Sequence, residues 1–147
     1  MGHQITLPRD YHQRDGIAVV ILELSDMVDR RTRKNKCMGK TVSLVLRDNT
    51  FSWLGRFRTL TRYTDLAEDL YAAGLWLLDQ HWGGVPVRMV GLSLAGLVSG
   101  HPVQSDIFSQ SERLGRLARA CDSIRNRFGE KVIKRASSLT RYGVAYE

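Results

Sequence analysis

The sequence predicts an α+β domain in which two helices cover one face of a four-stranded sheet. The 147 residues are 43% hydrophobic, enough to fill an ordinary core. Two segments space their apolar residues as a helix does, and the segments around them alternate as strands do. The resulting order is β-α-β-β-α-β within roughly the first hundred residues, which fits one domain with an appendage.

The first strand and the first helix are expected near the N-terminus. Residues 2–11 alternate weakly between apolar and polar side chains until Pro8, which predicts a short strand and then a turn. From Ile17 to Val28 apolar residues recur at helical spacing, and a basic cluster follows that suits a helix C-terminus. Gly39, just beyond the cluster, predicts the end of the helix.

A β-hairpin is expected next, because the period of the apolar residues changes to two. Residues 41–47 place Val42, Leu44 and Leu46 on one face of a strand. Asp48-Asn49 predicts a turn, and residues 51–61 resume as the second strand.

The second helix and the fourth strand complete the predicted sheet. Helical spacing runs from Leu66 to Leu78 with Thr64 as N-cap, and residues 86–98 alternate as a strand. A third helix is expected over 112–128, and residues 132–143 predict one short strand before a frayed end. We expect a DNA-binding domain at 1–98, a linker at 99–112, and a C-terminal helix and tail at 113–147.

Charge points to a polyanionic partner. The chain has 22 Lys and Arg against 15 Asp and Glu, a formal net charge of +7. That balance favours nucleic acid first and an anionic membrane second. The opening residues lack the apolar segment of a signal peptide, and the longest apolar stretch is too short to span a bilayer. We therefore expect a cytoplasmic protein without a membrane partner.

Motifs for catalysis or metal binding are incomplete. Gly39-Lys40-Thr41 resembles the end of a P-loop, but Lys34 stands where the first glycine is needed. The segment around Ser93 approaches a G-x-S-x-G nucleophile elbow, yet it lies inside a strand pattern. Cysteines and histidines are scattered and lack the spacing of metal ligands. We expect no catalytic site, no metal site and no cofactor in this chain.

Basic and hydroxyl side chains on the predicted sheet form a candidate DNA-binding surface. Arg56 and Arg58 are two residues apart, so they project from the same face of the second hairpin strand. Together with neighbouring donors they suit phosphate contacts, which are salt-sensitive and independent of sequence. Phe51 and Trp53 are expected near the turn, so gripping of the backbone is favoured over base stacking. The candidate DNA-binding residues are Lys40, Thr41, Ser43, Arg47, Arg56, Arg58 and Arg88.

The order of motifs resembles the little-finger domain of Y-family DNA polymerases, in the DNA polymerase IV and UmuC-like branch. The segments that carry the resemblance are LPRDY at 7–11, MGKTVSLVLR at 38–47, RFRTLTRYT at 56–64, PVRMVGLSLAGLV at 86–98, QSDIF at 104–108 and IRNRFGEKVIKRASSL at 124–139. The resemblance implies the little-finger fold, contact with template–primer DNA, and synthesis past damaged bases by a parent polymerase. It also implies that the parent's palm, fingers and thumb are partners, and that Mg²⁺ serves the parent and not this fragment.

Residues 104–108 resemble the peptide that bacterial proteins insert into the sliding clamp. The resemblance implies that Gln104 bonds at the rim of the clamp pocket while Ile107 and Phe108 fill its groove. The sliding clamp is therefore an expected partner. Ser105 stands where the peptide usually has leucine.

Two other functions stay open at this point. The chain could be a stand-alone ferredoxin-like module that binds nucleic acid and regulates, or a small enzyme with an unrecognised site. A palm domain encoded upstream would decide for the polymerase, and a titratable cluster in a deep pocket would favour the enzyme.

Overall fold

The structure is a computed structural model that describes residues 1–99 and 110–145. Its elements are β1 (Gly2–Tyr11), α1 (Arg14–Lys34), β2 (Cys37–Arg47), β3 (Trp53–Thr64), α2 (Ala67–His81), β4 (Val87–Ala95), β5 (Val98–Ser99), α3 (Gln110–Phe128) and the 3₁₀ helix η1 (Ala136–Leu139). The predicted order β-α-β-β-α-β is confirmed.

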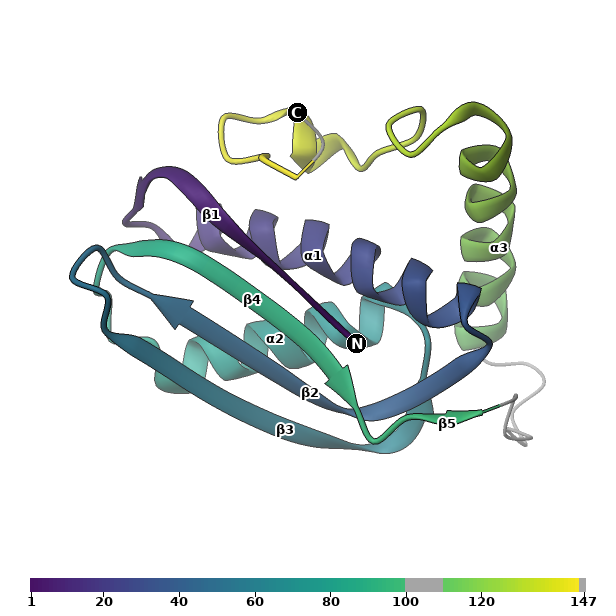
Figure 1. Ribbon diagram of the computed structural model, residues 1–147, viewed down its shortest axis with the longest axis horizontal. Helices are drawn as coiled ribbons and strands as arrows, with labels where there is room; N and C mark the ends of the chain where they lie inside the picture. Colours follow the sequence, from purple (N-terminus) through teal and green to yellow (C-terminus); the bar gives the residue numbers. More distant parts are fainter. Residues whose placement is uncertain (100–109, 146–147) are drawn as a thin grey trace.

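An antiparallel sheet in the order β1-β4-β2-β3 forms one layer, and α1 and α2 cover the same side of it (Figure 1). The short strand β5 pairs with the beginning of β2. In the described ranges, no helix combines the length and the apolar character that crossing a membrane requires. The predicted α+β class, with two helices on one sheet face, is confirmed.

The core lies between the sheet and the two helices. Val42, Leu44 and Leu46 of β2 are buried on the helix side, as their alternation predicts. Each fully buried side chain of this size contributes about 1.5–3 kcal/mol relative to an exposed one. The two helices approach closely at Gly74 of α2, because a Cβ there would lie 2.8 Å from Cγ2 of Ile21 in α1.

Two expected boundaries were wrong. Pro8 does not end the first strand: β1 continues to Tyr11, with an irregular register between Thr6 and Tyr11. An edge strand tolerates a residue without an N–H at such a point. The first helix ends at Lys34, and Gly39 lies inside β2, where a Cβ would approach the carbonyl oxygen of Ala95 to 2.8 Å.

The third helix is confirmed, and the structure shows that it attaches to α1 through polar groups. Arg33 of α1 donates hydrogen bonds to both carboxylate oxygens of Asp122 in α3, at 2.7 and 3.0 Å. Arg30 bonds both oxygens of Glu130, which follows α3. Burial raises the pKa of Asp122, but the bonds and charge of Arg33 and Arg30 outweigh it and lower the pKa overall.

The short strand expected within residues 132–143 was wrong, and the end of the chain at 146–147 lies outside the described residues. The C-terminal tail forms η1 instead, and it lies along α1 (Figure 1). The carboxylate of Glu23, which is 1% exposed, accepts hydrogen bonds from the Ser138 hydroxyl and from the backbone N–H groups of Val144 and Ala145. Arg135 pairs with Asp26 at 2.8 Å. These side-chain bonds replace the strand pairing that was expected.

Candidate nucleic-acid interface

The face of the sheet opposite α1 and α2 is called the open face below. Directly opposed residues of antiparallel strands share a face, so the register identifies its members. Since Val42 and Leu44 of β2 are buried under the helices, Ser43 between them belongs to the open face. The open-face residues are Gly2, Gln4 and Thr6 of β1, Met89, Gly91, Ser93 and Ala95 of β4, Thr41, Ser43, Val45 and Arg47 of β2, and Trp53, Gly55, Phe57 and Thr59 of β3.

Three of the predicted DNA-binding residues lie together on the open face: Thr41, Ser43 and Arg47 of the central strand β2. The Thr41 hydroxyl lies 3.3 Å from the hydroxyl of Thr59 on β3. The open-face residues include no Asp or Glu. This face therefore presents hydroxyl and guanidinium donors without a carboxylate among them.

Arg56 and Arg58 share a face with each other, as predicted, but it is not the open face. Arg56 lies opposite Leu44 and Arg58 opposite Val42, and both partners are buried under the helices. The Arg58 guanidinium lies 4.4 Å from the ring centre of Trp76 in α2. Because β3 is an edge strand, both arginines remain exposed. Their assignment to the open face was wrong.

Lys40 and Arg88 each have a partner inside the domain. The Lys40 ammonium lies 4.9 Å from the ring centre of Tyr63. Arg88 donates to the Leu7 carbonyl at 3.0 Å and pairs with Asp10 at 3.4 Å. Arg88 therefore joins β4 to β1 through these contacts, and its role in binding DNA stays a prediction.

The turn between β2 and β3 is held by a side chain. One carboxylate oxygen of Asp48 accepts hydrogen bonds from the backbone N–H groups of Thr50 and Ser52 and from the Thr50 hydroxyl. The hydroxyl bond and then the backbone bonds lower the pKa of Asp48. Phe51 occupies the left-handed region with φ 66°. The turn thereby fixes Arg47 opposite Trp53.

Trp53 and Phe57 were not among the candidate residues, although both belong to the open face and are 59% and 71% exposed. Trp53 was expected near the turn and Phe57 only as part of a motif. Their shared face follows from their spacing of four residues along one strand. Which face that is depends on the register of the hairpin.

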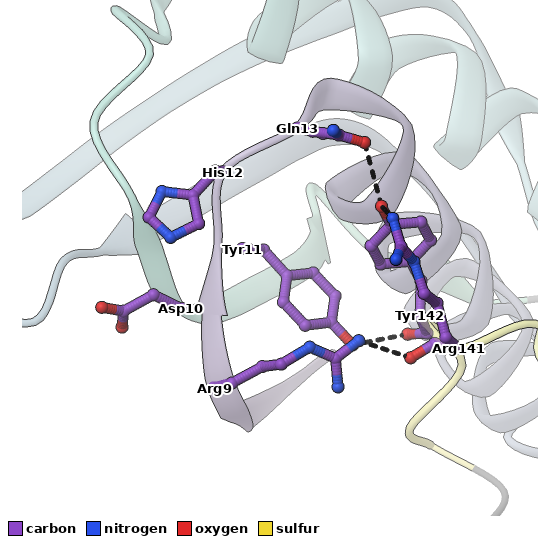
Figure 2. Close-up of a pocket in the computed structure, with 7 residues that line it drawn as sticks. All are labelled: Arg9, Asp10, Tyr11, His12, Gln13, Arg141 and Tyr142. Atoms are coloured by element: carbon purple, nitrogen blue, oxygen red, sulfur yellow. Dashed lines mark hydrogen bonds between the residues drawn. The ribbon is translucent and has the colours of Figure 1, made fainter.

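A pocket of about 430 Å³ lies where the tail meets the end of β1 (Figure 2). Arg9 and Tyr11 donate to the carbonyl oxygens of Arg141 and Tyr142, at 2.7 and 2.8 Å. The two tyrosine rings meet edge to face, and the Tyr142 hydroxyl bonds Gln13. These groups bond one another, so the pocket fastens the tail to β1. Its lining residues are Arg9, Asp10, Tyr11, His12, Gln13, Arg141 and Tyr142.

The remaining predictions concern the clamp-binding residues and metal binding. Gln104, Ile107 and Phe108 lie outside the described residues. Within residues 1–99 and 110–145, no group of three or more His, Cys, Asp and Glu side chains is placed to hold a metal ion.

Comparison with known proteins identifies relatives along the whole chain. The family model of the impB/mucB/samB C-terminal domain matches residues 1–107. The chain is 54% identical over 147 residues to DNA polymerase IV of Moorella thermoacetica, covering 99% of this chain and 37% of that protein. It is 41% identical to DNA polymerase IV 2 of Bacillus subtilis, covering 100% of this chain and 37% of the relative. The chain thus spans little more than a third of these relatives' length.

Solved structures share the fold. The complex of the β-clamp processivity factor and the little finger domain of PolIV matches with a TM-score of 0.52 and 25% identity, over 70% of this chain and 89% of that one. DinB from Sulfolobus solfataricus matches with a TM-score of 0.58 and 14% identity, over 67% of this chain and 29% of that one. The second likeness concerns the fold alone.

Proposed function

This chain belongs to the impB/mucB/samB family of C-terminal domains, and from that premise we propose that it is the DNA-binding domain of a Y-family translesion polymerase. Its open face contacts the backbone of template–primer DNA without reading the sequence. The relatives' name, DNA polymerase IV, supports the polymerase part of the proposal. The palm, fingers and thumb, and the Mg²⁺ of the reaction, belong to the rest of such a protein.

The composition of the open face is the observation that carries the DNA-binding part. Thr41, Ser43 and Arg47 offer donors along the central strand, and no open-face residue is acidic. Hydroxyl and guanidinium groups of this kind donate hydrogen bonds to phosphate oxygens. Because the open face has no carboxylate, no negative charge on it repels the phosphates. The net charge of +7 favours the same partner.

Two substitutions that each add one negative charge, one on the open face of the sheet and one on helix α2, test the proposal. Binding to a labelled primer–template is measured by fluorescence anisotropy. We expect the affinity of the unmodified chain to fall steeply between about 50 and 200 mM salt, because phosphate contacts release counterions. Ser43→Glu on the open face should weaken binding about tenfold. Gln80→Glu, the same charge change on exposed α2, should have little effect. Equal loss in the two variants would refute contact through the open face.

We infer, in addition, that Gln104, Ile107 and Phe108 dock into the sliding clamp. The peptide pattern supports this, as does the clamp complex formed by the structurally similar little finger domain. A short peptide with two apolar anchors buries little surface, and docking costs the freedom of its side chains, so the affinity is expected on the order of micromolar.

Titration of a bacterial β-clamp with the chain and with Ile107→Ala/Phe108→Ala tests the docking. The variant should lose clamp binding, because the two apolar anchors supply the buried area. It should keep its affinity for DNA, since neither residue is charged. Undiminished clamp binding by the variant would contradict the assignment.

A further inference from the structure

Two aromatic side chains stand exposed on the open face of β3. Trp53 lies opposite Arg47 and Phe57 opposite Ser43. The side chains are 59% and 71% exposed, values far from those of a packed aromatic ring. Large apolar surface left in water usually marks a binding site. The two rings are therefore candidates for contact with a ligand.

Arg47, at the end of the central strand β2, supplies a positive charge beside Trp53. Its guanidinium lies 5.5 Å from the ring centre of Trp53 and 5.1 Å from that of Phe51. Among the residues that the structure describes, no carboxylate pairs with Arg47, and its Nε lacks a hydrogen-bond partner. Arg14, Arg30, Arg33, Arg88 and Arg135 all form ion pairs. Arg47 is thus a cation held beside the rings of Phe51 and Trp53 without a carboxylate partner among the described residues.

The position between Trp53 and Phe57 on the open face of β3 carries no side chain. Gly55 separates them along β3, and Val45 lies opposite it on β2, followed by Gly91 on β4. A Cβ at Gly55 would have only Val45 within 4 Å, at 3.9 Å. The row therefore leaves space for a planar group against either ring.

We propose that Trp53 and Phe57 form a platform on which unpaired bases of single-stranded DNA stack, with Arg47 contacting the adjacent phosphate. Aromatic rings beside cationic groups are the means by which proteins bind single strands irrespective of sequence. The absence of Asp and Glu from the open face, and the net charge of +7, favour a polyanion over an apolar protein surface. The platform is defined by Arg47, Trp53 and Phe57.

Spacing distinguishes this platform from a duplex-binding surface. Four residues along a strand place Trp53 and Phe57 about 13 Å apart. That distance is nearly four base steps at the roughly 3.4 Å rise of a duplex strand. Paired bases are stacked on each other and cannot reach either ring. An unpaired strand can turn separate bases toward the two rings.

The platform rests on the proposed function, because it assigns the unpaired template to the same face as the duplex. The test therefore uses three DNA probes: a blunt duplex, the same duplex with a single-stranded template overhang, and that duplex with abasic positions in the overhang. Binding is measured by anisotropy for the unmodified chain, Trp53→Ala, Phe57→Ala and the control Phe128→Ala. Phe128 is 65% exposed on α3, so the control removes a similarly exposed ring elsewhere.

The unmodified chain should bind the overhang probe at least fivefold more tightly than the blunt or the abasic probe. Trp53→Ala and Phe57→Ala should each lose most of this gain, so that their affinities for the overhang and the blunt probe become nearly equal, and Phe128→Ala should keep the gain. Circular dichroism of each variant confirms folding, and Phe57→Leu serves if Phe57→Ala unfolds.

Three results would overturn the platform. Equal affinity for overhang and abasic probes would mean that bases are not contacted, although duplex binding would preserve the proposed function. Variants that keep the overhang gain but lose affinity for the β-clamp would identify a protein-docking surface instead. Failure of the unmodified chain to bind any probe at low salt would reject the proposed function and the platform with it.

Discussion

The carboxylate of Asp29 in α1 accepts a hydrogen bond from the backbone N–H of Ala67, 2.7 Å away, at the first residue of α2. A residue from one helix thus caps the other, while Leu66 at the N-cap position supplies no side-chain bond. Asp29 is 4% exposed and also pairs with Arg33. The carboxylate therefore joins the two helices and orders the beginning of α2.

This cap predicts a pH dependence of stability. Burial raises the pKa of Asp29 to about 7, although the Arg33 bond opposes the shift. The folded state then holds a proton that the unfolded state releases above about pH 4, so stability falls as pH rises from about 4 to 7. We expect the unmodified chain to lose about 2 kcal/mol more between pH 5 and 8 than Asp29→Asn. Urea unfolding at both pH values measures this. Parallel pH profiles would contradict it.

Glu23 anchors the tail, and its removal should destabilise the chain. Glu23→Ala leaves the Ser138 hydroxyl and the N–H groups of Val144 and Ala145 without their acceptor. Each unsatisfied group costs about 1–3 kcal/mol when it stays buried. We expect a loss of roughly 2 kcal/mol in chemical denaturation, and a smaller loss for Glu23→Gln, which keeps one acceptor. An alanine variant as stable as the unmodified chain would show that the tail does not bond Glu23 in solution.

Gly74 and Gly83 form a matched pair for testing the contact between α1 and α2. Gly74→Ala should destabilise by about 1–3 kcal/mol despite the better helix propensity of alanine, because its Cβ would press on Ile21. Gly83→Ala should be nearly neutral, since nothing lies within 4 Å of its Cβ. Thermal unfolding of both variants checks the prediction. A Gly74→Ala variant that melts higher would mean that the helices separate to make room.

Arg56 and Arg58, on the edge strand β3, should contribute less to the affinity for duplex DNA than the open-face residues do. Arg56→Ala/Arg58→Ala should fold with a loss of at most about 1 kcal/mol, mostly from the contact of Arg58 with Trp76. In the anisotropy assay it should lose less affinity for blunt duplex than Ser43→Glu. A larger loss in the double variant would place the duplex along the β3 edge.

The sequence predicted the order of the elements because their apolar periods are long and clear. Val42, Leu44 and Leu46 alternate over a whole strand, and α1 repeats its apolar residues over many turns. Alternation alone does not decide how two strands are aligned. A two-residue turn at Asp48-Asn49 would set Arg56 opposite Thr41, on the open face. The turn instead extends to Ser52, so Thr59 lies opposite Thr41.

That difference in register is three residues, an odd number, and an odd shift moves every side chain of β3 to the other face. The shift explains both errors at the candidate site. Arg56 and Arg58 were expected on the open face and lie on the other one, whereas Trp53 and Phe57 lie on the open face without having been expected there. The signal that was missed was local. Asp48 followed by Thr50 and Ser52 is typical of a turn closed by side-chain bonds. The tail contacts could not be found in this way, because Glu23 and Val144 are 121 residues apart in sequence.

Because α3 is attached through polar groups, it can unfold locally while the sheet stays folded. Among its residues 112–128, whose burial the structure describes, none belongs to the hydrophobic core, and Leu117 and Phe128 are largely exposed. An ion pair with an exposed partner, such as Arg30–Glu130, weakens as salt rises, whereas burial of Val42 or Leu92 in the sheet does not. The amide protons of α3 should therefore exchange with solvent through local opening, long before those of β2. The salt that releases DNA from the open face would also loosen this helix while the sheet stays folded.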